Sequence, residues 1–228
     1  MYKLYHMKKL FIVANWKSHK TTAEASAWLQ ELQSKQQELP EKEVIVCAPF
    51  TLLPAMKAFI SKHNLPIKLG AQDVSPFAEG AYTGAVNAKQ VKEFAEYVLI
   101  GHSERKRLFH EDEEMVVKKV EQARLAGLLP IVFLQDTASP VPAGVEIVVY
   151  EPPSAISTVS HGKPETPEDV AAASEKIHGQ HSDVAILYGG SVNEENVRGF
   201  TSLHLISGVV PGKASLAVES FYQIIEKA

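Results

Sequence analysis

His102 comes shortly after an apolar run, in a segment whose side chains can take part in proton transfer. Residues 98–100 are typical of a buried strand that ends at Gly101, and Ser103 and Glu104 are typical of a helix start. The partial positive charge of such a helix start disfavours protonation of a nearby imidazole. A neutral His102 could therefore donate a hydrogen bond to a substrate carbonyl. The alternative is an ordinary surface histidine in a polar turn.

Glu151, Asn15 and Lys17 also follow apolar runs. Glu151 comes directly after residues 148–150, so its carboxylate should be partly desolvated and a better proton acceptor. Asn15 and Lys17 follow residues 10–14 and carry donors that can stabilise an oxygen as it becomes negative. Each of these residues alone could be a solvated loop residue.

Two glycine-containing turns follow the last two apolar runs. They are Gly189-Gly190-Ser191 and Gly212-Lys213. Backbone N–H groups at turns from strand to helix bind phosphate well, although glycines there usually only form the turn. Combined with the residues above, these turns predict a proton-transfer site beside an anion site.

The elements that must position these residues form a regular alternation of strands and helices. We expect strands at residues 10–14, 44–48, 67–71, 97–100, 129–134, 145–150, 184–188 and 208–210. We expect helices from 21, over 52–60, 87–96 and 113–126, from 166, near 193–199 and after 215. This order predicts an α/β protein, a single (β/α)8 barrel, with its active site at the carboxyl ends of the strands.

The connection between the fifth and sixth strands departs from this alternation. It consists of residues 135–144 and includes Pro140, Pro142 and Gly144. A crossover between parallel strands normally needs a dozen or more residues, usually with a helix. We therefore expect this helix to be missing or vestigial, so that something else covers the outer face of these strands.

Composition limits the possible partners and compartments. The chain has 228 residues, 45% of them hydrophobic, and a net charge of −4, which argues against nucleic acid as a partner. No apolar run reaches the length of a membrane span. A single cysteine, Cys47, fits a reducing compartment, and the N-terminus lacks the apolar core of a signal peptide, so we expect the cytoplasm. Residues 1–9 are expected to be an N-terminal extension with the start of the first strand, and residues 10–228 one catalytic domain.

Five segments of the chain, in this order, resemble the signature segments of the triosephosphate isomerase family. They are Asn15-Trp16-Lys17, Ile100-Gly101-His102-Ser103-Glu104-Arg105, Tyr150-Glu151-Pro152, Tyr188-Gly189-Gly190-Ser191-Val192 and Gly212-Lys213-Ala214-Ser215-Leu216. The resemblance implies a TIM barrel that interconverts dihydroxyacetone phosphate and D-glyceraldehyde 3-phosphate through an enediolate, without a cofactor or a metal.

The resemblance also implies catalytic roles. Glu151 would be the base that moves a proton between two substrate carbons, and His102 the neutral electrophile. Lys17 and Asn15 would stabilise the enediolate oxygen, and Glu104 would pair with Lys17.

The resemblance assigns the phosphate to the two glycine-containing turns and to a lid that begins at Glu151. The residues implied are Asn15, Lys17, Ser157, Gly189, Gly190, Ser191, Gly212 and Lys213. Lys213 replaces the second glycine of a family pair, which keeps the backbone amide and adds a charge to the phosphate field. The lid departs from the family at Ser154, where tryptophan is usual, and at Ser157 and Val159, where glycine is usual.

Residues 72–84 form a long loop rich in turn formers, and loops of this length are usually functional or form an interface. In the family the matching loop docks into a second subunit, where the position of Thr83 reaches the other active site. A homodimer is therefore implied. Ala85 replaces an interface glutamate, and the missing fifth helix leaves a larger assembly possible.

Two other functions compete with the isomerase. The altered lid motivates a catalytically impaired barrel that binds phosphometabolites or protein partners. A Schiff-base aldolase acting on sugar phosphates would need a desolvated lysine as its nucleophile, whereas the sixth strand ends in Glu151.

Overall fold

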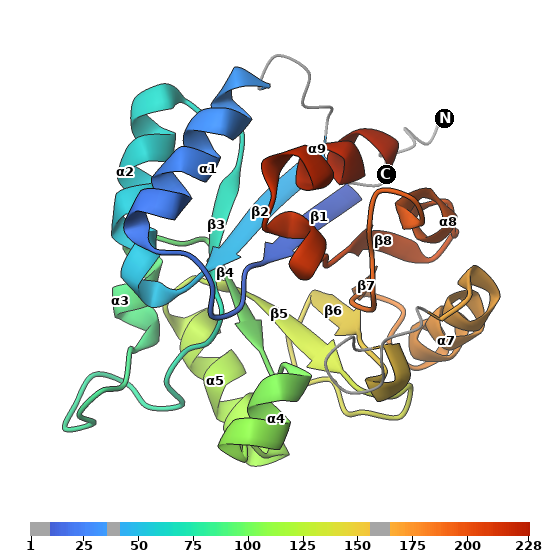
Figure 1. Ribbon diagram of the computed structural model, residues 1–228. Helices are drawn as coiled ribbons and strands as arrows, with labels where there is room; N and C mark the ends of the chain where they lie inside the picture. The colour runs from blue at the N-terminus through green and yellow to red at the C-terminus, as the bar shows by residue number, and fades with distance from the viewer. Residues whose placement is uncertain (1–9, 36–41, 156–164) are drawn as a thin grey trace, which may run out of the picture.

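The computed structural model describes residues 10–35, 42–155 and 165–228. Its centre is a closed barrel of eight parallel strands that pair in sequence order, with β8 returning to β1, and helices surround this barrel (Figure 1). The strands are β1 Leu10–Asn15, β2 Lys42–Ala48, β3 Lys68–Ala71, β4 Tyr97–Ile100, β5 Leu129–Leu134, β6 Ile147–Tyr150, β7 Ala185–Tyr188 and β8 Ile206–Val209. The predicted (β/α)8 barrel is confirmed.

Helices follow the strands in the expected order. The α-helices are α1 Thr22–Ser34, α2 Leu53–His63, α3 Ala88–Lys92, α4 Ser103–Phe109, α5 Glu113–Leu125, α7 Pro167–Gln180, α8 Val197–Thr201 and α9 Val218–Lys227. Short 3-10 helices are η2 Phe50–Leu52, η3 Pro153–Ala155 and η4 Lys213–Ser215. The predicted capping box before α1 is present, since Thr21 and Glu24 bind each other's backbone N–H groups.

The strands bury both of their faces, which explains why they are continuous apolar runs in the sequence. On β6, Ile147 and Val149 lie in the barrel interior with Phe133, whereas Val148 and Tyr150 pack in the layer between the barrel and the helices. A packed interior closes the barrel and leaves the rim at the carboxyl ends of the strands as the place for a site.

The connection from β5 to β6 contains turns and no helix over residues 135–146, as predicted. The chain itself covers the outer face at this place. Val141 packs against the core, and Gln180 of α7 donates from its side-chain amide to the carbonyl of Thr137. The outward-facing Val132 and Val148 are accordingly buried, so a second molecule is not needed to cover them.

Several elements are shorter than the sequence predicts, and the cause is clear for two of them. The helix expected over 87–96 ends at Lys92, because the Glu96 N–H donates to the carbonyl of Leu69 and thereby starts the pairing of β4 with β3. The sixth strand begins at Ile147 instead of residue 145, because the Val145 N–H closes a turn onto the carbonyl of Pro142.

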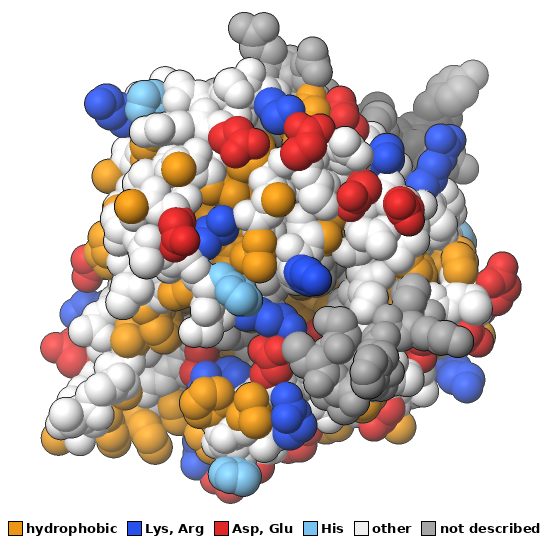
Figure 2. All heavy atoms as spheres, in the orientation of Figure 1, with side chains coloured by type: hydrophobic (Ala, Val, Ile, Leu, Met, Phe, Trp, Pro, Cys, Tyr) orange, Lys and Arg blue, Asp and Glu red, His pale blue; other side chains and the backbone are white. Residues whose placement is uncertain are grey.

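On the face drawn in Figure 2, acidic and basic side chains alternate without a large region of one sign, in keeping with the small net charge of −4. None of the helices in the described ranges is long and apolar enough to cross a membrane. The expected extension over residues 1–9 lies outside the described residues.

Candidate active site

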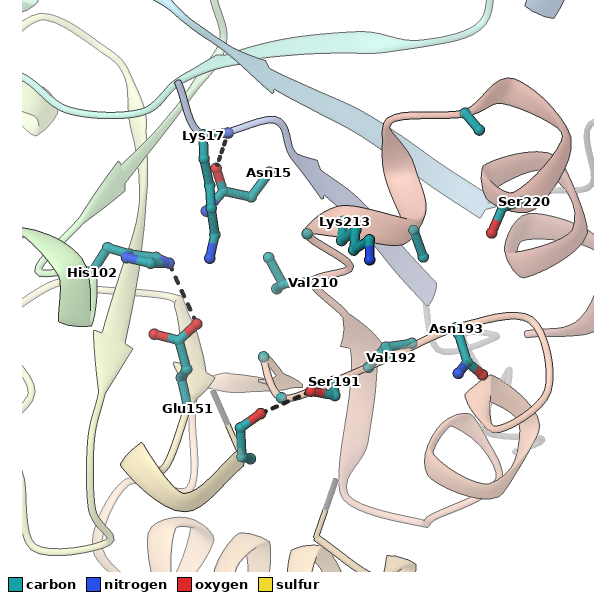
Figure 3. Close-up of a pocket in the computed structure, with 16 residues that line it drawn as sticks. Asn15, Lys17, His102, Glu151, Ser191, Val192, Asn193, Val210, Lys213 and Ser220 are labelled. Carbon is teal, nitrogen blue, oxygen red and sulfur yellow. Dashed lines mark hydrogen bonds and ion pairs between the residues drawn. The ribbon is translucent and has the colours of Figure 1, made fainter. Parts of the chain in front are cut away.

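The predicted site residues surround one cavity of about 390 Å³ at the carboxyl ends of the strands (Figure 3). Its lining includes Asn15, Lys17, His102, Glu151, Ala155, Gly189, Gly190, Ser191, Val192, Asn193, Val210, Gly212, Lys213, Ala214, Ala217 and Ser220. Every predicted site residue in the described ranges is in this set except Glu104, which contacts the site through Lys17. Ser157 lies outside the described residues.

Glu151 is buried, with 5% of its surface exposed, immediately after β6. Its backbone N–H donates to the carbonyl of Leu134, which continues the pairing of β6 with β5 and fixes where the side chain begins. Carboxylate oxygen Oε2 accepts a hydrogen bond of 2.7 Å from the Ser103 hydroxyl. Oxygen Oε1 lies 3.4 Å from Nε2 of His102 (Figure 3). The base candidate is thus desolvated and held in one orientation.

His102 occupies the N-cap position of α4, and its Nδ1 accepts a hydrogen bond of 3.1 Å from the Glu104 backbone N–H. A backbone N–H can only donate, so Nδ1 carries no proton and a neutral ring carries its proton on Nε2. Gly101 makes the turn before His102 with φ +75°, a backbone conformation that side chains disfavour. The ring packs edge-on against Phe133, which fixes its plane. Nε2–H is therefore the group that His102 presents beside Glu151.

Lys17 is fixed at its backbone and at its side chain. The Lys17 N–H donates to Oδ1 of Asn15 at 3.1 Å, and the Lys17 carbonyl accepts from the Gln72 side-chain amide at 2.9 Å. Its ammonium lies 2.7 Å from Oε1 of Glu104. This ion pair confirms the contact expected between Lys17 and Glu104. Because the oxygen of the Asn15 side chain accepts from Lys17, its NH2 group is the end available to donate.

The turn after β7 brings backbone close to the base. A Cβ at Gly189 would lie 2.5 Å from Cγ1 of Val149 and 3.3 Å from Cβ of Glu151, so only glycine fits. Gly190 is enclosed by the Tyr188 side chain in the same way. Ser191 follows, and its hydroxyl donates to the carbonyl of Ala155 at 3.0 Å (Figure 3). These contacts hold the turn against the end of β6.

The turn after β8 lies beside Lys17, because a Cβ at Gly212 would lie 3.6 Å from Cε of that lysine. Lys213 begins η4, where the backbone turns sharply and Ser215 binds back to the carbonyl of Gly212 through its N–H and its hydroxyl. The donors of both turns thus line the same cavity as Lys17, His102 and Glu151.

A model of the triosephosphate isomerase family matches two overlapping segments of the chain, residues 10–147 and 140–228. The chain belongs to the triosephosphate isomerase family. It is therefore an enzyme of the isomerase class.

Individual triosephosphate isomerases are similar over nearly their whole length. That of Dictyoglomus thermophilum is 34% identical over 250 residues, covering 96% of this chain and 100% of the relative. That of Synechocystis sp. is 36% identical over 249 residues, covering 96% of this chain and 98% of the relative. The crystal structure of triosephosphate isomerase from Bartonella henselae superposes with a TM-score of 0.82 at 27% identity, over 96% of this chain and 100% of that one.

The site of this triosephosphate isomerase family member includes residues whose contacts the sequence does not reveal. In the sequence, Ser103 is typical only of a helix start, and Gln72 is only the first residue of a loop. Ser103 binds Glu151 across 48 positions, and Gln72 binds Lys17 across 55. No local pattern could reveal contacts of this range. Asn193 and Ser220, at the far end of the cavity, were also missed.

Residues on the two sides of the segment 156–164, which is not described, contact one another. The Ser154 hydroxyl donates to Glu165 at 3.4 Å, and the Glu165 N–H donates to the Tyr188 hydroxyl at 3.2 Å. Burial and the neighbouring Glu165 raise the pKa of Tyr150 to about 12. The predicted lid residues Ser157 and Val159 lie outside the described residues.

In the described ranges, no group of three or more His, Cys, Asp or Glu side chains could hold a metal ion.

Proposed function

We propose that this cavity interconverts dihydroxyacetone phosphate and D-glyceraldehyde 3-phosphate, with Glu151 as the base. Membership of the triosephosphate isomerase family supports a triose phosphate as the substrate. The observation that carries the assignment is that Glu151, His102 and Lys17 line one cavity together with the two glycine-containing turns.

The reaction needs one base and a set of donors. Glu151 removes a proton from C1 of dihydroxyacetone phosphate, and negative charge develops on the oxygen of C2. The Nε2–H of His102 and the ammonium of Lys17 donate to this oxygen, and such preorganised donors stabilise charge that forms during the reaction. A proton passes from the C1 hydroxyl to the C2 oxygen through His102. The protonated Glu151 then returns its proton to C2, which yields the aldehyde without net gain or loss of atoms.

The phosphate group fits the other half of the cavity. The backbone N–H groups of Gly190, Gly212 and Lys213 belong to residues that line this part, and a phosphate accepts from several such donors at once. To join them, the Ser191 hydroxyl turns away from the Ala155 carbonyl, to which it donates in this structure. We propose that Ser157 completes this set from the lid. Closure of the lid would exclude water and strengthen every charge interaction inside.

A coupled assay with D-glyceraldehyde 3-phosphate tests the proposal. Glu151→Gln should lower kcat by roughly 10³-fold, because general base catalysis typically contributes about 10²- to 10⁴-fold. Glu146→Gln, an exposed carboxylate near the start of the same strand, is the matched control and should retain full activity. Substrate binding by the unmodified chain without turnover would instead establish an impaired, phosphometabolite-binding barrel.

We also propose that the active form is a homodimer in the cytoplasm, built through the loop 72–84 with Thr83 reaching toward the second active site. The buried thiol of Cys47 and the absence of any other cysteine support a reducing compartment.

A further inference from the structure

Lys213 lines the active-site cavity with a side chain that the proposed chemistry does not use. It extends from η4 toward the cavity that Lys17 enters from β1 (Figure 3). The residue is exposed, and among the described residues no carboxylate lies within ion-pair distance of its ammonium. Lys17, by contrast, is paired with Glu104 at 2.7 Å. Lys213 is therefore a cation at the cavity whose charge is not already neutralised by a described neighbour.

The charges at the cavity indicate what this cation adds. Lys17 and Lys213 are positive, Glu104 and Glu151 are negative, and a neutral His102 adds no charge. Without Lys213 the set would carry one positive and two negative charges. A phosphate that is close to dianionic at neutral pH would then enter a site with an excess of negative charge.

We propose that the ammonium of Lys213 forms a direct ion pair with the substrate phosphate. This inference rests on the proposed function, since it assigns the phosphate to the turns at Ser191 and Gly212. The backbone donors of those turns fix the phosphate by geometry, and Lys213 adds a point charge on a flexible stem. Lys213 thus determines specificity for the charge of the substrate, whereas Glu151, His102 and Lys17 determine the chemistry.

The size of the expected change in KM, and its dependence on salt, follow from the exposure of Lys213 to water. An ion pair that water still reaches is screened by salt and is worth a modest amount. Removing the charge should therefore raise KM about three- to fivefold at low ionic strength, with kcat little changed. The difference should shrink as salt is added. A role only in the stability of η4 would show no such salt dependence.

The experiment compares Lys213→Gln, which removes the charge, with Lys213→Arg, which keeps it. KM and kcat are measured with D-glyceraldehyde 3-phosphate at two ionic strengths, and the Kd of inorganic phosphate is measured by calorimetry. D-Glyceraldehyde, which lacks the phosphate, serves as the second substrate. Lys62→Gln, an exposed lysine in the last turn of α2, controls for the loss of one positive charge from the molecule.

We expect Lys213→Gln to weaken phosphate binding and to raise KM about three- to fivefold, while kcat/KM for D-glyceraldehyde stays unchanged. Lys213→Arg should behave like the unmodified chain. If the phosphate Kd and the KM of Lys213→Gln lie within twofold of those of Lys62→Gln, the inference is overturned and the proposed function still stands. An equal loss of kcat/KM with D-glyceraldehyde 3-phosphate and with D-glyceraldehyde would also overturn it. An unmodified chain that binds phosphate through Lys213 but does not turn over would instead refute the proposed function.

Discussion

Lys17 has a backbone φ of 50°, in the left-handed region that residues with a Cβ seldom occupy. Such a conformation costs about 1–3 kcal/mol and persists only where the surroundings fix it. Here Asn15 and Gln72 bind the backbone N–H and carbonyl, and Glu104 binds the ammonium. The position of the ammonium therefore depends partly on Gln72 and Glu104, which do not line the cavity.

Replacing Gln72 tests this dependence. Gln72→Ala removes the donor to Lys17 and to the carbonyl of Cys47, to which Gln72 also donates at 3.0 Å. We expect kcat/KM to fall about tenfold, the equivalent of roughly 1.4 kcal/mol, because misplaced donors stabilise the transition state less well. Steady-state kinetics measure the effect, and thermal melting reports any loss of stability separately.

Gln223→Ala, on the exposed face of α9, is the matched control for Gln72→Ala and should leave the kinetics unchanged. Conservative replacement by Gln72→Glu keeps the size of the side chain but removes its donor, and it should resemble Gln72→Ala. Full kcat/KM in both Gln72 variants would show that the Lys17 conformation does not need this contact.

At the level of residues, the sequence predicted which side chains line the cavity and missed the residues that hold them in place. Glu151, His102 and Lys17 stand out because each follows an apolar run, and the barrel topology brings those run ends to one rim. Ser103 and Gln72 act through single long-range hydrogen bonds, which depend on side-chain placement in three dimensions. Sequence spacing carries no information on such contacts.

A buried charge cluster joins the start of the loop 72–84 to α4 and α5. Lys119 is 1% exposed and binds both Asp73, at 2.6 Å, and Glu111. Arg105 lies 2.8 Å from Asp73 and 2.8 Å from Glu111. Burial alone would raise the pKa of Glu111, but Lys119 and Arg105 hold it below its ordinary value. The pKa of Asp73 is raised, because burial outweighs the same two cations there.

Glu111→Gln tests the cluster through stability. Removing one partner leaves buried Lys119 with less compensation, and we expect a loss of about 3 kcal/mol in the free energy of unfolding. A carboxyl with a lowered folded-state pKa stabilises the fold above its ordinary pKa of 4.5 and loses this contribution as the pH falls through the lowered value. Urea unfolding at a series of pH values should show this acid-dependent part in the unmodified chain and not in Glu111→Gln.

Glu114→Gln is the control for that measurement, since Glu114 pairs with Lys118 on the exposed face of α5. The free energy of unfolding of Glu114→Gln should stay within about 0.5 kcal/mol of that of the unmodified chain. A Glu111→Gln variant as stable as Glu114→Gln would contradict a structural role for the buried cluster.

Element positions were predictable, whereas some element ends were not. The helix expected near 193–199 is observed as α8, Val197–Thr201. It begins late because the Asn193 side chain accepts from the N–H groups of Glu195 and Asn196, which holds a turn at the place where the helix was expected to start. Competing side-chain hydrogen bonds of this kind, and the pairing partners of strands, set boundaries that apolar periodicity cannot show.

At the scale of the whole molecule, the loop 72–84 exposes two aromatic side chains to solvent. Phe77 and Tyr82 are 45% and 46% exposed, and their rings stack at 4.4 Å. The loop projects from the barrel between β3 and α3 (Figure 1). Paired aromatic side chains on a long exposed loop are typical of an interface, because their burial against a partner is favourable. The proposed homodimer would cover them.

The double change Phe77→Ser and Tyr82→Ser tests this assembly. We expect the unmodified chain to elute at about twice its 25.0 kDa mass and the double variant at one times that mass, as measured by chromatography with light scattering. The variant should also lose kcat/KM, since Thr83 would no longer reach a second active site. Leu125→Ser, which alters a side chain that is 76% exposed on α5, controls for loss of surface apolarity and should stay dimeric. A fully active 25.0 kDa species of the unmodified chain would contradict the role assigned to this loop.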